Sequence, residues 1–239
     1  MCRVAGIIDQ HASDESLNKN VLQMCNVMAH GGPDDAGFYE PTAHTVLGHR
    51  RLALIDLSKA GHQPMLRNNL TISFNGEIYN YPEIKATLTS LGSVFSTHTD
   101  TEVILAGFEM WGTEIFNKLE GMVAFALHDA DAGLTYLARD QSGIKPLYYY
   151  VANDKLIFAS EVKAFSASGY TFVWTFNGGT LPNTTPTLSV NQPGNYTVTV
   201  TDTASGCQGM ASATITVSST AVVQAIVKEA FDLDQIIVV

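Results

Sequence analysis

Cys2 follows the initiator methionine directly, and this position restricts the fold more than any other feature of the sequence. Cysteine is small enough for the methionine to be removed in a cell, which would make Cys2 the first residue. A free α-amine titrates near ~7.7–8.0 and a thiol near ~8.5, so the amine can serve as base for the thiol. If Cys2 supplies both the nucleophile and the base, the reaction takes place at the start of the chain. The apolar strand expected at Val4–Ile8 would then have to place Cys2 in an active site. The alternative is a small residue at a frayed terminus.

Short polar motifs follow Cys2 along the first two thirds of the chain. They are Met28–Gly37 (MAHGGPDDAG), Gly48–Leu57 (GHRRLALIDL), Gly61–Met65 (GHQPM), Phe74–Tyr81 (FNGEIYNY), Thr99–Leu105 (TDTEVIL), Arg139–Tyr149 (RDQSGIKPLYY) and Ala159–Ala164 (ASEVKA). Together they closely resemble the glutaminase domain of asparagine synthetases, which are class II glutamine amidotransferases of the N-terminal-nucleophile hydrolase superfamily. The resemblance covers roughly residues 2–165. The forms Pro33-Asp34 and Gln63-Pro64-Met65 favour this branch over the glucosamine-phosphate and purine-pathway branches.

The chemistry that the resemblance implies can be matched to residue types. Hydrolysis of the side-chain amide of glutamine is an acyl transfer, which needs a thiolate, a base and donors for the developing oxyanion. Cys2 offers the thiol, with its own amine as the base. Asn75 and Gly76 offer a side-chain N–H and a backbone N–H side by side, and the resemblance gives the matching Asn and Gly the oxyanion role. Read alone, Asn75-Gly76 is typical of a type I′ hairpin turn after Leu70–Phe74.

A free glutamine also needs a cation for its α-carboxylate and an anion for its α-ammonium. Arg51 fits the first task, because a planar guanidinium can form two parallel hydrogen bonds to a carboxylate. Asp100 fits the second task. The resemblance implies this pair, and it completes the pocket with backbone near Leu54 and Glu77.

Other interpretations exist for the two charged residues. Arg51 can be a surface residue of a strand, and Arg50 is a rival for its role; the resemblance favours Arg51. Asp100 precedes an expected helix at Thr101–Trp111, where it can act as the N-cap. Capping and ligand binding are compatible if the carboxylate is shared.

One motif departs from the family. The usual His-Arg-Gly-Pro-Asp reads His30-Gly31-Gly32-Pro33-Asp34. The family's arginine helps to order the loops near the nucleophile, so glycine at position 31 removes a cation and adds backbone freedom. We expect this change to affect turnover more than the fold. His30 is a candidate base, but the resemblance assigns that task to the amine, so a structural loop histidine is favoured.

Composition excludes several functional classes. The chain has 239 residues, 46% of them hydrophobic, enough for one sizeable domain with a small second one. A net charge of −10 without a Lys/Arg cluster argues against nucleic acid and anionic membranes as partners. No apolar run reaches the ~18–20 residues that span a bilayer, and no signal peptide precedes Cys2. Three cysteines cannot all pair within the chain, which indicates a reducing compartment, and we expect the cytoplasm. Zinc spacings and Walker-type loops are missing, so no metal or cofactor is expected.

The apolar patterns predict an α+β fold for residues 2–165, and the resemblance implies a four-layer αββα sandwich. The expected helices are Glu15–Met28, capped by Asp14, Tyr81–Leu91 and Thr101–Trp111. The expected strands are Val4–Ile8, Thr45–Gly48, Arg51–Ile55, Thr71–Phe74, Met122–His128, Leu134–Ala138, Pro146–Val151 and Leu156–Ala159.

The composition changes abruptly at about Phe165. Residues 168–217 contain no lysine or arginine and alternate like half-buried strands at Tyr170–Phe176, Thr187–Val190, Asn195–Thr201 and Ala211–Val217. The segment from Pro193 to Cys207 resembles PKD-type Ig-like modules of bacterial surface and secreted proteins, which act as spacers or adhesive units. We therefore expect a small all-β module at 168–217. The tail at 218–239 is expected to form a short apolar helix and then the apolar segment Gln235–Val239, which either forms a replacement edge or stays loose.

Three functions are compatible with these features. The first is a glutamine amidohydrolase domain that converts L-glutamine to glutamate and ammonia through a Cys2 thioester. The second is a catalytically inactive fusion whose Ig-like segment serves as an interaction or adhesion surface. The third is an N-terminal-nucleophile acylase or peptidase, which the pair Arg51 and Asp100 disfavours because it recognises a free amino acid. The family continues with an ATP-using synthetase domain that opens with a Ser-Gly-Gly-Leu-Asp-Ser loop; since the 239 residues contain none, we expect the synthetase domain or other ammonia acceptor to be missing from this chain.

Overall fold

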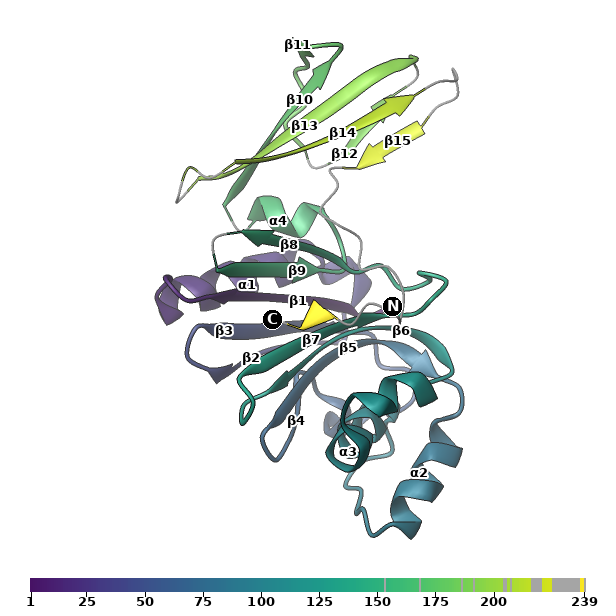
Figure 1. Cartoon of the computed structure of the whole chain (residues 1–239). Coiled ribbons are helices and arrows are strands. Elements are labelled where there is room, and N and C mark those ends of the chain that lie inside the picture. Colours follow the sequence, from purple (N-terminus) through teal and green to yellow (C-terminus); the bar gives the residue numbers. More distant parts are fainter. Residues whose placement is uncertain are drawn as a thin grey trace.

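Two antiparallel five-stranded sheets lie face to face at the centre of the molecule (Figure 1). The computed structural model describes residues 1–152, 154–167, 169–185, 187–190, 192–203, 206, 208–215, 221–224 and 237–238. The first sheet has the order β2 (Asp35–Thr42), β3 (Thr45–Arg51), β1 (Arg3–Asp9), β9 (Lys155–Ala159) and β8 (Tyr148–Ala152). The second has the order β16 (Ile237–Val238), β7 (Leu134–Arg139), β6 (Gly121–Asp129), β5 (Leu70–Ile78) and β4 (Met65–Arg67).

Helices cover the outer face of each sheet, which gives the expected four-layer αββα arrangement (Figure 1). The outer face of the first sheet packs against α1 (Asp14–Val27) and α4 (Lys163–Ala167). The outer face of the second packs against α2 (Tyr81–Ser90) and α3 (Asp100–Trp111). Short 3₁₀ segments follow α1 and α3 and precede β4; they are η1 (Ala29–Gly31), η3 (Gly112–Lys118) and η2 (Lys59–Gly61).

Side chains alternate between the two faces of each strand, and this alternation places small residues between the two sheets. In β6, Val123, Phe125 and Leu127 pack against the helices, whereas Ala124 and Ala126 face the other sheet. Successive side chains of a strand point to opposite faces, so one strand can present bulky residues outward and small ones inward. The small inner residues leave room for large side chains of the opposite sheet; these include Val4, Leu47 and Phe158.

Strands between Tyr170 and Gln224 form two small sheets that lie beyond α4 and β8 (Figure 1). One has the order β11 (Gly179–Thr180), β10 (Tyr170–Phe176), β13 (Gly194–Asp202) and β14 (Gln208–Ile215), and the other pairs β12 (Thr187–Val190) with β15 (Ala221–Gln224). Their apolar core is continuous with the core under α1, because Phe165 and Tyr170 belong to one buried cluster. The Tyr150 and Tyr170 rings also meet edge to face, with 5.6 Å between centroids.

Part of the tail differs from expectation. Ala221–Gln224 forms a strand instead of a helix, because these residues pair antiparallel with β12 and their two valines favour extended backbone. The rest of the expected helix lies outside the described residues. At the end of the chain, Ile237 and Val238 pair with β7, so the replacement-edge alternative holds for these two residues.

Two further local expectations were wrong. The predicted strand Arg51–Ile55 is the end of β3 followed by a loop, and Leu54 and Ile55 in that loop are exposed. The N-cap of α1 is Ser13, whose hydroxyl accepts the N–H of Ser16, and not Asp14. The Asp14 carboxylate instead accepts the N–H of His44, a residue distant in sequence.

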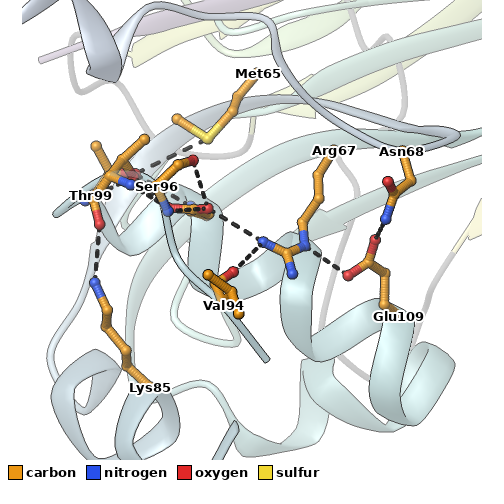
Figure 2. A network of polar contacts seen from close by, with 10 residues as sticks. Met65, Arg67, Asn68, Lys85, Val94, Ser96, Thr99 and Glu109 are labelled. Carbon is orange, nitrogen blue, oxygen red and sulfur yellow. Dashed lines mark hydrogen bonds and ion pairs between the residues drawn. The ribbon is translucent and has the colours of Figure 1, made fainter. Parts of the chain in front are cut away.

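A buried carboxylate fixes the segment that leads into α3. Glu102 accepts the backbone N–H groups of Ser96 and Thr97, both of their hydroxyls, and Arg67 Nη1 at 3.2 Å. Figure 2 shows Ser96 and Arg67 within this network of polar contacts. Burial alone would raise the pKa of Glu102, but the hydrogen bonds outweigh it and hold the pKa below its ordinary value of 4.5. The stabilisation is therefore present above about pH 4.5 and is lost as the pH falls through the lower folded-state pKa.

We predict that Glu102→Gln lowers the free energy of unfolding at pH 7 by about 2–3 kcal/mol, because a neutral amide replaces a charge-assisted acceptor and turns one N–H toward other donors. The matched control is Glu109→Gln, which also loses a contact with Arg67 but lies at the surface, and it should cost less than about 1 kcal/mol. Urea unfolding at pH 7 and at pH 3.5 measures both, and the difference between the two variants should shrink at the lower pH. Equal costs at pH 7 would contradict the role of Glu102.

Candidate active site

The residues predicted from separate motifs line one pocket. Its walls come from the chain start, the end of β3 with the loop after it, β5, and the start of α3. All seven predicted residues contribute, namely Cys2, Arg51, Leu54, Asn75, Gly76, Glu77 and Asp100. Residues that the sequence analysis did not assign also line it, among them Met1, Gln63 and Lys145.

Cys2 lies immediately before β1 with its thiol directed at the loop after β3. Its Sγ accepts the N–H of Leu52 at 3.3 Å. Burial raises the pKa of the Cys2 thiol, while the Leu52 hydrogen bond and the positive charges of the N-terminal amine, Arg51 and Lys145 oppose that rise. Cys25 in α1 differs, because burial raises the pKa of its thiol to about 12 with one distant cation to oppose it. Of these two described cysteines, Cys2 is the one in a pocket with cations.

Asn75 and Gly76 lie inside β5, so the hairpin-turn interpretation is wrong. They pair with Ala124 and Val123 of β6, because the strand continues to Ile78. The Asn75 side chain is 1% exposed, and its Nδ2 has no hydrogen-bond partner among the described residues. Buried polar groups are normally paired, so an unpaired amide donor in a pocket wall is suited to a ligand atom.

The backbone N–H of Gly76 points to the same side as the pocket. Alternate residues of a strand direct their N–H groups to one edge. Phe74 N–H donates to Gln63 Oε1 at 2.6 Å and Ile78 N–H to Asp100 Oδ2 at 3.1 Å, both away from β6. Gly76 lies between them with the same orientation. A side chain at this position is excluded, because a Cβ would lie 2.3 Å from the carbonyl oxygen of Met122.

Arg51 is the last residue of β3 and is 8% exposed. Its guanidinium donates to the carbonyls of Ser58, at 3.0 Å, and Asp56 in the following loop. It packs on Gly61, where a Cβ would lie 2.0 Å from Arg51 Nη2. Arg50, the rival candidate, is not among the residues that line the pocket. The structure therefore brings Arg51, and not Arg50, to the site.

Asp100 is the first residue of α3, and the N-cap is Thr99, whose hydroxyl accepts the N–H of Glu102. The alternative interpretation, that Asp100 caps the helix, is therefore wrong, because its carboxylate turns to the edge of β5. Burial raises the pKa of Asp100 to about 6; hydrogen bonds from backbone N–H groups, first that of Ile78, oppose the rise, and the charge of Glu77 adds to it. A buried carboxylate is stabilised further by a cationic group.

Lys145 is the main feature that sequence reasoning missed. Its side chain is 2% exposed, lines the pocket, and places Nζ 2.6 Å from the Met1 sulfur. The loop that carries it is fixed by Asp140, which accepts the N–H groups of Ile144 and Lys145 at 2.8 and 3.0 Å. The motif Arg139–Tyr149 supported the resemblance but gave no sign that its lysine turns inward to the thiol.

His30 lies outside the pocket lining, and its Nε2 is 3.0 Å from a carboxylate oxygen of Glu161. This agrees with the structural interpretation of that histidine. Within the described part of the chain, no cluster of His, Cys, Asp and Glu is placed to hold a metal ion. The same residues contain no helix with the length and apolar character needed to cross a membrane.

Comparison with known proteins establishes the family. The sequence profile of the glutamine amidotransferase domain matches residues 1–214. The chain therefore belongs to the glutamine amidotransferase domain family, as its motifs indicated. The matched residues extend past the domain boundary expected near residue 165.

Curated relatives and solved structures agree with this assignment. The chain is 40% identical over 168 residues to asparagine synthetase [glutamine-hydrolyzing] 1 of Bacillus subtilis, covering 69% of this chain and 26% of the relative. It is 38% identical over 167 residues to asparagine synthetase B [glutamine-hydrolyzing] of Escherichia coli, covering 69% of this chain and 30% of the relative. The chain thus spans about a quarter to a third of the length of these relatives.

Two solved structures share the fold. One is glutamine phosphoribosylpyrophosphate amidotransferase from B. subtilis complexed with ADP and GMP, with a TM-score of 0.58. The other is described as the allosteric regulatory enzyme of purine biosynthesis, with a TM-score of 0.61. Each is 21% identical to this chain and covers 89% of it and 49% of the solved chain. Identity at this level supports the fold alone.

Proposed function

We propose that this chain hydrolyses the side-chain amide of L-glutamine to glutamate and ammonia through a thioester on Cys2. The observation that carries the proposal is the unpaired, buried amide of Asn75 in the same pocket as the Cys2 thiol. An opposite-charge pair, Arg51 and Asp100, lines that pocket as well. The reaction needs a nucleophile, an oxyanion donor and a binding site for the charged groups of a free amino acid.

The reaction would proceed in two halves. After removal of Met1, the freed α-amine of Cys2 takes the thiol proton, and Sγ attacks the amide carbon of glutamine. Asn75 Nδ2 and Gly76 N–H donate to the oxyanion, and collapse of the tetrahedral intermediate releases ammonia as the amine returns its proton to the leaving nitrogen. Water, activated by the same amine, then cleaves the thioester and releases glutamate. The buried Lys145 favours the thiolate by its charge.

Recognition of the amino-acid end would use the two charged residues. The guanidinium of Arg51 exchanges its contacts with the Asp56 and Ser58 carbonyls for the α-carboxylate of glutamine. Asp100 accepts the α-ammonium, and the backbone near Leu54 and Glu77 completes the contacts. Leu54 is 60% exposed on the loop after β3, where it can cover a bound ligand.

The acceptor of the ammonia is proposed from the relatives. Both curated relatives described above are named asparagine synthetases, and this chain matches about a quarter to a third of each. We infer that the ammonia is used by a synthetase part outside the 239 residues, in the cytoplasm. Residues 168–217 would then act as a β module without catalytic groups, since the pocket lining contains none of the described residues of that region.

The proposal predicts that the purified chain releases ammonia from glutamine, and that Cys2→Ala abolishes this release while the fold is retained. Cys25→Ala is the matched control, because it removes a buried thiol outside the pocket. Intact mass should show that the active form lacks Met1, since the α-amine is the base. Full activity with Met1 retained, or in Cys2→Ala, would contradict the mechanism. A wild-type chain that lacks Met1 and releases no ammonia would support the inactive-fusion alternative.

The roles of Asn75 and the charged pair are separable by kinetics. Asn75→Ala should lower kcat by ~10²–10³ with KM little changed, because the donor acts on charge that develops in the transition state. Arg51→Ala should instead weaken glutamine binding by about tenfold to a hundredfold, the loss expected for a charge-assisted contact of ~1.5–3 kcal/mol. Asn69→Ala is a surface control for Asn75, since its amide contacts Asp131 far from the pocket. An Asn75→Ala variant that changes KM alone would refute the oxyanion role.

Glutamine binding should depend on pH through Asp100. The pKa of Asp100 lies at about 6, so protonation below that pH removes the negative charge that would bind the α-ammonium. In the Cys2→Ala background, which removes the chemical step, the Kd for glutamine should rise about tenfold per pH unit below 6. Asp100→Asn in that background should bind weakly and show no such slope. Calorimetric titration from pH 5 to 8 measures this, and an unchanged slope in Asp100→Asn would exclude the carboxylate as the titrating group.

A further inference from the structure

The side chain of Arg3 fills the space above Gly31, the position where the family motif carries its arginine. A Cβ on Gly31 would lie 2.5 Å from Cζ, 2.7 Å from Nε and 2.8 Å from Cγ of Arg3. Gly31 is buried, and its own N–H is bonded to Met28 O at 3.0 Å, so its backbone is fixed. Glycine at this position therefore makes room for the guanidinium of Arg3, which is the first residue of β1.

Arg3 also contacts the main chain of the nucleophile. Its Nη1 donates to the carbonyl oxygen of Cys2 at 3.0 Å and to that of Met1 at 2.9 Å. Its Nε forms an ion pair with Glu161. The guanidinium thus connects the first residues of the chain to the segment after β9. A planar group with several fixed donors can bridge a carboxylate and carbonyls at once, which an ammonium cannot do in the same geometry.

Glu161 is itself held in place by other groups. His30 Nε2 lies 3.0 Å from its Oε1 and Lys163 Nζ lies 2.9 Å from its Oε2. Burial alone would raise the pKa of Glu161, but the contacts with Arg3 and Lys163 outweigh it, so the carboxylate stays charged at neutral pH. Its neighbour Ser160 accepts the N–H of Val4 at 2.9 Å. The start of β1 is therefore anchored at successive residues.

We propose that Arg3 is a positioning residue for Cys2, and that its guanidinium takes the place of the arginine that the family motif carries at position 31. The inference rests on the proposed nucleophilic role of Cys2. Chain termini fray unless contacts hold them, and removal of Met1 would leave the Cys2 carbonyl as the terminal contact of Arg3. On this proposal Arg3 supplies the cation that position 31 lacks, so Gly31 should not impair turnover.

Four variants of the full chain without Met1 test the proposal: Arg3→Gly, Arg3→Lys, Gly31→Arg and the double variant Arg3→Gly/Gly31→Arg. Arg3→Gly should lower kcat about ten- to a hundredfold with KM little changed, because a nucleophile displaced by about 1 Å loses reaction rate on that order. Arg3→Lys should recover only part of this loss. Gly31→Arg alone should also be impaired, since Arg3 occupies the space. The double variant should recover kcat to within about threefold of wild type.

Lys163→Ala is the matched control, because it removes another cation from Glu161 without a contact to the chain start, and kcat should stay within about twofold. Circular dichroism at the assay temperature restricts the comparison to folded protein. An unchanged kcat in Arg3→Gly, or a double variant no better than the worse single variant, would overturn the proposal.

Alkylation of Cys2 by iodoacetamide gives a readout that is independent of glutamine. The alkylation rate at one pH, measured on folded protein, should change in Arg3→Gly and return toward the wild-type rate in the double variant, because the position of the thiol changes and is then restored. If wild type releases no ammonia but alkylation follows this pattern, the glutaminase proposal fails while the positioning role stands. If alkylation is the same in all variants, the positioning role fails whatever the glutaminase assay shows.

Discussion

The pocket depends on one incompletely paired edge of β5. Strand β4 pairs with β5 only from Leu70 to Ile72, so the outer N–H and carbonyl groups of the alternate residues beyond Ile72 have no strand partner on that side. Unpaired strand edges are normally covered. Here side chains cover most of this edge: Gln63 and His49 bind the N–H and carbonyl of Phe74, and Asp100 binds the N–H of Ile78. The stretch of edge between them carries Gly76, the residue proposed as the backbone donor of the site.

The residues that line the pocket were predicted from the sequence more reliably than the contacts that hold each of these residues in place. The resemblance named residues that all line the pocket, although they come from the chain start, the end of β3 and the loop after it, the interior of β5 and the start of α3. Local rules failed where a distant group competed. Aspartate is a residue type that often caps helices. The carboxylate of Asp100, however, accepts the N–H of Ile78, which is 22 residues away, and Thr99 is the N-cap. In the same way, the predicted strand at Arg51–Ile55 ends at its first residue, because the guanidinium of Arg51 binds carbonyls of the loop that follows.

The charges around Cys2 distinguish its thiol from the thiol of Cys25. Burial by itself favours the neutral thiol of Cys2, as it does for Cys25 in the helix. The difference lies in the surroundings, since Cys2 has the N–H of Leu52 and the charges of Arg51 and Lys145 near it. Lys145 could not be assigned from the sequence, because a lysine is usually exposed and nothing near it in the motif indicates an inward orientation. Its burial becomes intelligible only with the thiol and Glu77 beside it.

The chain start is held from two sides, and this limits what a single motif position can reveal. On one side Leu52 fixes the sulfur of Cys2, and on the other Arg3 binds its carbonyl and the carboxylate of Glu161. Read along the sequence, position 31 lacks the arginine of the family motif; in space, the guanidinium of Arg3 lies in the volume next to Gly31. The positioning role proposed for Arg3 rests on this placement, because the same guanidinium contacts the carbonyl of Cys2. A motif position is therefore best judged together with the side chains that surround it in the structure.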